Sequence, residues 1–153
     1  MINIRRATLE DMDTLVKLRL DFLRHMATLR EDDEATLSAQ FADYLSRHLN
    51  RNALAVLAET DCQVASIALL TVAEQPAHRY LPSGKSGTLL NVYTYPEYRR
   101  RGLSIQVVRR TIEEARNMGV SAIDLLATPE GKPLYEQLGF GDTPLPAMRL
   151  RIF

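Results

Sequence analysis

The chain has 153 residues, with 19 Lys and Arg residues balanced by 19 Asp and Glu residues. A net charge of zero argues against a surface built as a whole for nucleic acid or an anionic membrane, because both attract an excess of positive charge. Hydrophobic residues make up 46% of the chain and charged residues 25%, which is typical of a folded domain and excludes a disordered chain.

Length and cysteine content set further limits. A chain of this size buries roughly 68–70% of its unfolded surface, so we expect a single domain over residues 1–153. Cys62 is the only cysteine, which excludes an intrachain disulfide and a zinc site built on cysteine pairs, and no other metal site is expected. The N-terminus lacks an apolar signal core, and no apolar run approaches the roughly 20 residues that span a bilayer. We therefore expect a cytoplasmic protein with no membrane partner.

The first part of the chain predicts a short strand followed by two helices. Residues 2–5 alternate in polarity and predict the strand. Thr8 can then cap the first helix, and the Asp11 carboxylate three residues later interacts favourably with the helix dipole. Apolar residues at helical spacing then form two stripes, separated by an acidic run. They are Leu15, Leu18, Phe22 and Met26 in the first helix, and Leu37, Phe41, Leu45 and Leu49 in the second.

The acidic run, residues 31–34, has two interpretations. It suits the solvated N-terminus of the second helix, where negative charge interacts favourably with the helix dipole. It could also form an acidic rim that attracts a cationic amine.

The middle of the chain predicts strands. The apolar runs 53–59 and 63–72 have strand length, and the two residues after the first run fit a hairpin turn. Residues 76–87 contain prolines and glycines and predict a loop. Residues 88–94 then predict a third strand, rich in Leu, Val and Tyr, which ends before Pro96.

The last part alternates between helix and strand. A helix begins after Gly102 and ends at Gly119, residues 122–127 predict a strand, residues 134–138 a short helix, and the alternating residues 148–152 a final strand. The complete order is β-α-α-β-β-β-α-β-α-β. This order predicts a mixed α/β domain in which helices flank a central sheet.

Residues 89–104, LLNVYTYPEYRRRGLS, carry the clearest chemical signal. A strand leads through an arginine-rich turn and Gly102 into a helix, whose first N–H groups and dipole favour an anion. Gly102 permits close approach or a positive φ, and arginines bind phosphate oxygens through charge-assisted hydrogen bonds. Neither the Walker loop nor the dinucleotide fingerprint is present, so this is a phosphate cradle of another kind.

The turn from Arg99 to Ser104 resembles the acetyl-CoA pyrophosphate loop of the GNAT N-acetyltransferase superfamily, [RQ]-x-x-G-x-[GA]. Residues 91–98 are similar to the strand and turn before that loop, and residues 127–140 to the family's second cofactor segment. The order of elements matches along essentially the whole chain. One departure is Ser104, where the family usually has glycine or alanine. Serine is small enough for close packing, and its hydroxyl could donate to a phosphate.

The resemblance implies a central, mostly antiparallel mixed sheet, acetyl-CoA as the acetyl donor, and direct attack of an amine on the thioester in a ternary complex. It implies a cofactor site along the third long strand and the arginine turn. The residues of that site are Val92, Tyr93, Thr94, Arg99, Arg100, Arg101, Gly102, Leu103 and Ser104.

Two residues carry the expected catalysis. The backbone N–H of Val92 would stabilise the oxyanion, in a strand that splays from its neighbour to admit the pantetheine arm. Tyr135 occupies the position of the family's usual general acid, which protonates the leaving thiolate. The alternative for Tyr135 is a core aromatic beside Leu134 and Leu138.

Other parts of the mechanism stay open at this stage. The sequence offers Glu59, Glu97, His25, His78 and a water bound to Asn91 as alternatives for the general base. Tyr80 and Tyr93 could stack on the acceptor or simply pack. The acceptor is a small-molecule or peptide amine, and nothing in the sequence separates the two.

Alternative functions also follow from the sequence. A non-catalytic acyl-CoA-binding module could use the same fold, and a protein-modifying enzyme would need an open groove. A nucleic-acid partner is not expected. The alternating residues 148–152 could act as an edge strand between two copies, which would give a homodimer.

Overall fold

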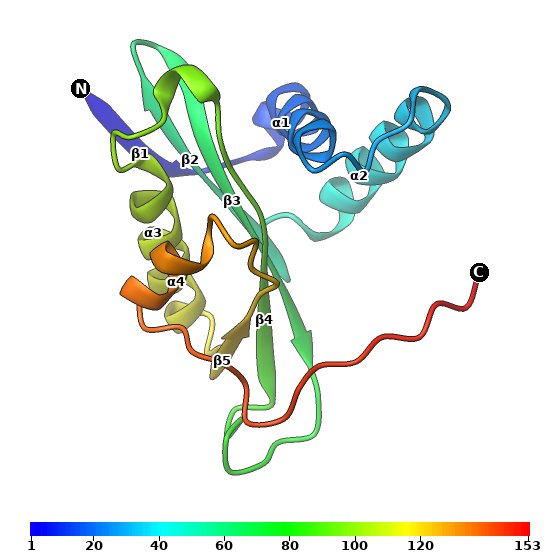
Figure 1. The fold of residues 1–153 in the computed structure, drawn as a ribbon, viewed down its shortest axis with the longest axis vertical. Helices are drawn as coiled ribbons and strands as arrows, with labels where there is room; N and C mark the ends of the chain where they lie inside the picture. Colours follow the sequence, from blue (N-terminus) through cyan, green and yellow to red (C-terminus); the bar gives the residue numbers. More distant parts are fainter.

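Five strands form one sheet in the computed structural model of the chain, which describes residues 1–153 (Figure 1). The strands lie side by side in the order β1-β2-β3-β4-β5. Their bounds are β1 (Ile2–Arg6), β2 (Ala53–Thr60), β3 (Gln63–Glu74), β4 (Lys85–Thr94) and β5 (Ala122–Asp124). The first four strands pair antiparallel and β5 pairs parallel to β4. The predicted mixed, mostly antiparallel sheet is confirmed.

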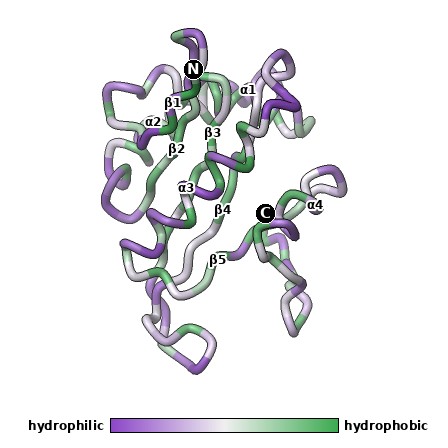
Figure 2. Tube along the Cα trace, turned by 90° about the vertical axis from the view of Figure 1, so that its left-hand side faces the viewer, coloured by the Kyte–Doolittle hydropathy of each residue, from purple (hydrophilic) through white to green (hydrophobic).

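Helices cover both faces of this sheet (Figure 1). Helices α1 (Met12–His25) and α2 (Glu34–His48) lie on one face, and α3 (Leu103–Asn117) and α4 (Lys132–Gln137) on the other. Strand β2 is buried along almost its whole length, because helices cover both of its sides. Figure 2 shows the hydrophobic residues of the central strands enclosed by more hydrophilic helices and loops.

Two apolar clusters hold these layers together. On the α1–α2 side, Leu15, Leu45 and Leu57 are fully buried, and on the α3 side Leu54, Leu70 and Val107 are fully buried. Leu54 and Leu57 come from the same strand and belong to opposite clusters. The apolar helix stripes predicted from the sequence therefore face the sheet, except that Met26 follows the end of α1 and is exposed.

The entry to α1 forms as the sequence predicts. Thr8 and Asp11 make a reciprocal capping box, in which the Asp11 carboxylate accepts from the Thr8 backbone N–H at 2.8 Å. Arg5 donates to both carboxylate oxygens of Asp11 at 2.8 Å. The hydrogen bonds from Arg5 lower the pKa of Asp11, and the backbone N–H of Thr8 lowers it further against the opposing effect of burial.

We expect Asp11→Asn to destabilise the fold by about 1–2 kcal/mol at neutral pH, the combined effect of a lost cap and a weakened charge-assisted pair. The folded-state pKa of Asp11 is depressed, so its contribution is present above the unfolded pKa and disappears as pH falls through the folded value. Urea unfolding should therefore separate wild type from variant more widely at pH 7 than at pH 3. Asp13→Asn, an exposed change in the first turn of α1, is the control. Equal effects of the two variants would contradict this role for Asp11.

Two sequence expectations fail near the C-terminus. The strand predicted over residues 122–127 ends already at Asp124, and residues 148–152 form no strand. The tail leaves the domain (Figure 1), and Met148, Leu150 and Ile152 are exposed. Alternating polarity is not sufficient for a strand, because a strand also needs a neighbour that pairs with its backbone.

The acidic run takes the structural role expected of a helix N-terminus. Residues 31–33 form a short 3₁₀ turn, and Glu34 begins α2 and pairs with Arg24 of α1 at 2.8 Å. None of the helices combines the length and the apolar character needed to cross a bilayer.

Candidate functional site

Strand β4 is irregular where the sequence places the catalytic backbone. Tyr93 pairs with Ile67 and Leu90 pairs with Leu69, so Asn91 and Val92 together face only Ala68. This is a β-bulge, and Asn91 takes a left-handed conformation in it, with φ of 53°. On its other side β4 pairs with β5 only over residues 86–88. The second half of β4 therefore has no strand beside it on that side, which is the splay that the resemblance implies.

The arginine turn continues directly from this half of β4. Arg100 and Gly102 both have left-handed backbones, with φ of 64° and 74°, and Gly102 is the N-cap of α3. No side chain caps the first turn of α3, so its leading N–H groups remain directed out of the helix. Alternating left-handed residues before an uncapped helix turn backbone N–H groups toward one concave site that suits an anion.

A cavity of about 370 Å³ lies at this site. It is lined by parts of β4, the arginine turn, the first turn of α3 and one side of α4, and its residues are Thr94, Tyr98, Arg99, Arg100, Gly102, Leu103, Ser104, Ile105, Leu134 and Gln137. Six of the nine residues predicted to hold the cofactor line it. Arg101, Val92 and Tyr93 do not.

The three consecutive arginines have different surroundings. Arg99 donates from Nε to the Thr94 carbonyl at 3.0 Å, and its guanidinium lies 5.8 Å from the centre of the Tyr93 ring. Arg101 lies over the ring of Tyr98 at 5.4 Å. Arg100 lines the cavity without an ion-pair partner, which leaves its guanidinium available for an anion.

Ser104 is part of a chain of hydroxyls that joins β3, β4 and α3. Ser66 donates to the Tyr93 carbonyl at 3.1 Å, and the links from Ser66 to Thr94 and from Thr94 to Ser104 are both 2.7 Å. Each hydroxyl has one proton, so the donation to a carbonyl fixes the direction of the whole chain. Thr94 donates to Ser66, and Ser104 donates to Thr94. In this arrangement the proton of the Ser104 hydroxyl is directed to Thr94, and donation from Ser104 to a phosphate stays a prediction.

We expect Thr94→Val to cost about 1–2 kcal/mol of stability, because it keeps the shape of the side chain but breaks one buried and one half-buried hydrogen bond. It also unties the start of α3 from β4. Thr88→Val, at an exposed position of the same strand, is the matched control for thermal unfolding. A Thr94 variant as stable as the control would contradict the hydroxyl chain.

The side chains of Val92 and Tyr93 point to opposite faces of the sheet. Val92 packs in the α3-side cluster, whereas Tyr93 is buried against α1, where Phe22 meets its ring edge-on and His25 lies 5.7 Å from it. Neither side chain enters the cavity. Any contribution of these residues to a cofactor comes from their backbones.

Tyr135 lies in α4, on the helix that supplies Leu134 and Gln137 to the cavity wall. Its ring packs edge-on against Phe140 at 5.8 Å and belongs to the margin of the α3-side cluster. Its hydroxyl makes no hydrogen bond within the protein, and burial raises its pKa above the ordinary value of tyrosine. Such a phenol keeps its proton throughout the neutral range.

The candidates for a general base separate clearly in space. Glu59 is bound by Arg5 at 2.7 Å on the β1–β2 side, and His78 accepts from the backbone of Tyr80 in the 75–84 loop. Tyr80 is exposed in that loop. Glu97 follows β4 in an exposed turn. His25 of α1 lies beside the Tyr93 ring of β4. Asn91, the residue that would hold a water as base, belongs to β4 and contacts Arg19 of α1.

Arg19 is a site residue that the sequence does not reveal. It lies on α1 between the buried Leu18 and Leu20 and donates to Oδ1 of Asn91 at 3.1 Å. Burial lowers the pKa of Arg19. The only signal in the sequence is an arginine placed between two apolar residues, and helical periodicity alone assigns such a residue to the surface.

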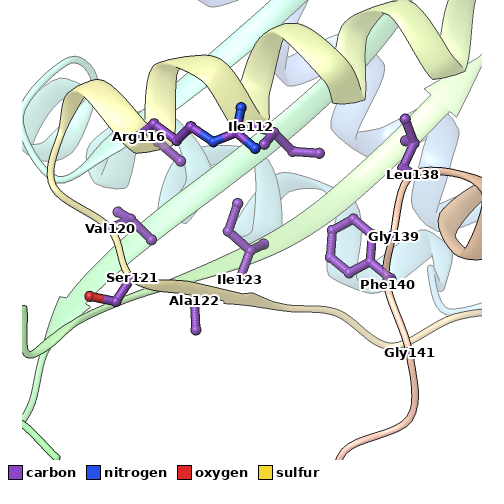
Figure 3. A pocket seen from close by; sticks show the side chains of 11 residues that line it. Ile112, Arg116, Val120, Ser121, Ala122, Ile123, Leu138, Gly139, Phe140 and Gly141 are labelled. Carbon is purple, nitrogen blue, oxygen red and sulfur yellow. The ribbon is translucent and has the colours of Figure 1, made fainter. Parts of the chain in front are cut away.

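A second cavity, of about 430 Å³, lies elsewhere (Figure 3). It is formed by the end of α3, by β5 and by residues 138–141, and Ile123 and Phe140 project into it. Arg116 is its only titratable side chain. Its one hydroxyl, that of Ser121, has no general acid or base in the lining to activate it, so this cavity does not support transfer chemistry.

Comparison with known proteins agrees with this geometry. The model of the Acetyltransferase (GNAT) family matches residues 14–140. No curated protein matches the sequence. Among solved structures, a predicted acetyltransferase from Clostridium acetobutylicum with acetyl-CoA is 27% identical, has a TM-score of 0.84, and the match covers 99% of this chain and 97% of the other.

Two further structures share the fold. A GCN5-related N-acetyltransferase from Ralstonia eutropha JMP134 is 25% identical with a TM-score of 0.82, covering 98% of this chain and 99% of that one. Glucosamine-6-phosphate N-acetyltransferase from Arabidopsis thaliana is 16% identical with a TM-score of 0.72, covering 98% of both chains.

Proposed function

The chain belongs to the GNAT family of acetyltransferases, and from this premise we propose that it is an N-acetyltransferase that transfers the acetyl group of acetyl-CoA to a primary amine. The observation that carries the proposal is the cavity at the start of α3, where an uncapped helix meets the left-handed residues Arg100 and Gly102 beside the half of β4 that does not pair with β5. These features suit a chain of phosphates followed by an extended arm that lies along a strand.

The residues fit acetyl-CoA in a specific order. Backbone N–H groups from Arg100 to Ser104 would bind the pyrophosphate, and Arg100 would add its charge. Arg99 would hold the turn against Thr94 rather than bind phosphate itself. Arg101 would contribute through its backbone only. Acetyl-CoA supplies an activated acetyl group as a thioester.

Two groups of the chain would act on the reacting atoms. In a ternary complex the acceptor nitrogen attacks the thioester carbonyl directly, and charge develops on the carbonyl oxygen. The bulge at Asn91 interrupts the regular β3–β4 pairing directly before Val92, and the backbone N–H of Val92 would act there as the oxyanion donor. Tyr135 would give its phenolic proton to the departing thiolate sulfur.

A release assay for free CoA thiol against a diverse panel of primary amines tests the proposal, since each acetyl transfer releases one thiol. Turnover with at least one amine and an N-acetylated product by mass spectrometry would support it. Binding of acetyl-CoA without turnover on any amine would favour the alternative, a non-catalytic acyl-CoA-binding module on the same fold. A homodimer and a cytoplasmic location stay predictions; sedimentation at several concentrations tests the first.

A further inference from the structure

Arg19 is a half-buried cation without a counter-ion. No carboxylate lies within 4.0 Å of its guanidinium, whereas its neighbours on the same helix, Lys17 and Arg24, both pair with Asp21. Removing a charge from water without a partner is costly. A protein that keeps an arginine in this state holds a site whose missing partner is an anion.

The surroundings of Arg19 fix its guanidinium in place. One nitrogen donates to Oδ1 of Asn91, and the guanidinium carbon lies 5.7 Å from the centre of the Phe41 ring of α2. Arg19 has five N–H donors, and Asn91 is the only hydrogen-bond acceptor it reaches. The remaining donors have the fork geometry that binds a carboxylate at two points.

Asn91 adds a second unsatisfied donor. Asn91 is 1% exposed, and its Nδ2 has no hydrogen-bond partner. Exchanging the oxygen and nitrogen of this amide would not help, because Arg19 would then face another donor. A buried donor of this kind costs about 1–3 kcal/mol, so its retention next to an unpaired arginine is not explained by folding alone.

The position of this pair relates it to the proposed reaction. Asn91 is the left-handed residue of the β4 bulge, and Val92, the proposed oxyanion donor, follows it in the chain. The pair lies on the α1 side of the sheet, while the phosphate cradle lies at the start of α3, which packs on the opposite face. An anion held by Arg19 would therefore belong to the acceptor and not to the coenzyme.

We propose that the acceptor is an amine that carries a carboxylate, such as an amino acid or a related amino-carboxylate, and that Arg19 binds this carboxylate. Asn91 is a positioning residue, which orients the guanidinium through Oδ1. The inference rests on the proposed acetyl transfer and deepens it, since it names the substrate class of the same site. Apolar surroundings from Phe41 and the buried α1 leucines strengthen the pairing by lowering the local dielectric.

Matched acceptor pairs test the inference. Each pair contains an amino acid and its carboxamide, which keeps the amine and the side chain but removes the negative charge. Wild type should acetylate the amino acid with a kcat/KM about 10- to 150-fold higher than that of the amide, the range expected for hydrogen bonds to a charged group. Arg19→Gln should remove this preference by raising the KM for the amino acid, with the KM for acetyl-CoA unchanged. Arg47→Gln, an exposed arginine of α2, should keep it.

A binding measurement tests the carboxylate site separately from the proposed acetyl transfer. Calorimetric titration with N-acetyl amino acids, the expected products, reports on the carboxylate site without turnover. Binding that is lost in Arg19→Gln and kept in Arg47→Gln supports the inference even if no amine in the panel reacts, a result that would contradict only the proposed function. Two results would overturn the inference. One is a wild type that acetylates the amino acid and the amide of every pair equally well, and the other is equal binding of N-acetyl amino acids to wild type and Arg19→Gln.

Discussion

Tyr135→Phe is expected to lower kcat by roughly 10- to 10⁴-fold while the affinity for acetyl-CoA changes little. The change deletes one oxygen that makes no hydrogen bond within the protein, and the ring keeps its packing against Phe140. The fold should therefore be unaffected, and any loss of rate reports on the proton that the phenol supplies. Steady-state kinetics together with calorimetric binding of acetyl-CoA measure the two effects separately.

The control for Tyr135 is Tyr44→Phe in α2. Burial raises the pKa of Tyr44 as it does that of Tyr135, but Tyr44 packs against His48, away from the cavity. Both variants remove a half-buried phenolic oxygen, so a general effect of that loss would appear in both. A kcat for Tyr135→Phe within twofold of the Tyr44→Phe value would place Tyr135 among the packing residues and leave protonation of the thiolate to solvent.

Gly102→Ala is expected to raise the KM for acetyl-CoA by about 5- to 150-fold, which corresponds to about 1–3 kcal/mol of backbone strain. The nearest side-chain atoms to an added methyl group are 3.9 Å away, so space is not the obstacle. The obstacle is φ of 74°, which alanine avoids. If the turn in this variant relaxed to a negative φ, its backbone N–H groups would no longer point to the proposed phosphate site. Binding of acetyl-CoA would then have to restore the left-handed conformation.

Gly141→Ala is the matched control for Gly102. Its added methyl group meets nothing within 4 Å, and its φ lies outside the left-handed range. Both variants are compared by KM for acetyl-CoA and by thermal unfolding. A Gly102 variant that is destabilised but binds acetyl-CoA as wild type does would show that the turn serves the fold and not the coenzyme.

Features that depend on neighbours in the chain could be predicted from the sequence. The capping box of Thr8 and Asp11 needs only residues three apart, and the arginine turn with its glycine N-cap needs only one strand, one turn and one helix start. Local backbone preference largely decides such motifs. For the same reason the arginine turn stands where the sequence predicts it, and six of the nine residues predicted to hold the cofactor line one cavity.

Features that depend on distant parts of the chain could not be predicted. The hydroxyl chain joins Ser66 to Ser104, and the Arg19–Asn91 pair joins residues 72 positions apart. No short-range sequence pattern distinguishes these four residues from others of the same type. The prediction of a strand over residues 148–152 is wrong for a related reason. Whether a segment finds a strand to pair with depends on the whole sheet, and residues 148–152 pair with none.

The sequence by itself determined the order of elements up to α4, the family resemblance and the arginine turn before α3, because each is encoded in short-range patterns of polarity, glycine and arginine. The tertiary structure decided the roles of individual side chains. It showed Arg99 bound to the Thr94 carbonyl, gave Ser104 a fixed hydrogen-bond direction, and brought a lone arginine of α1 to a bulge in β4. These contacts arise only when the layers close, since burial and hydrogen bonding between distant segments exist only in the folded chain.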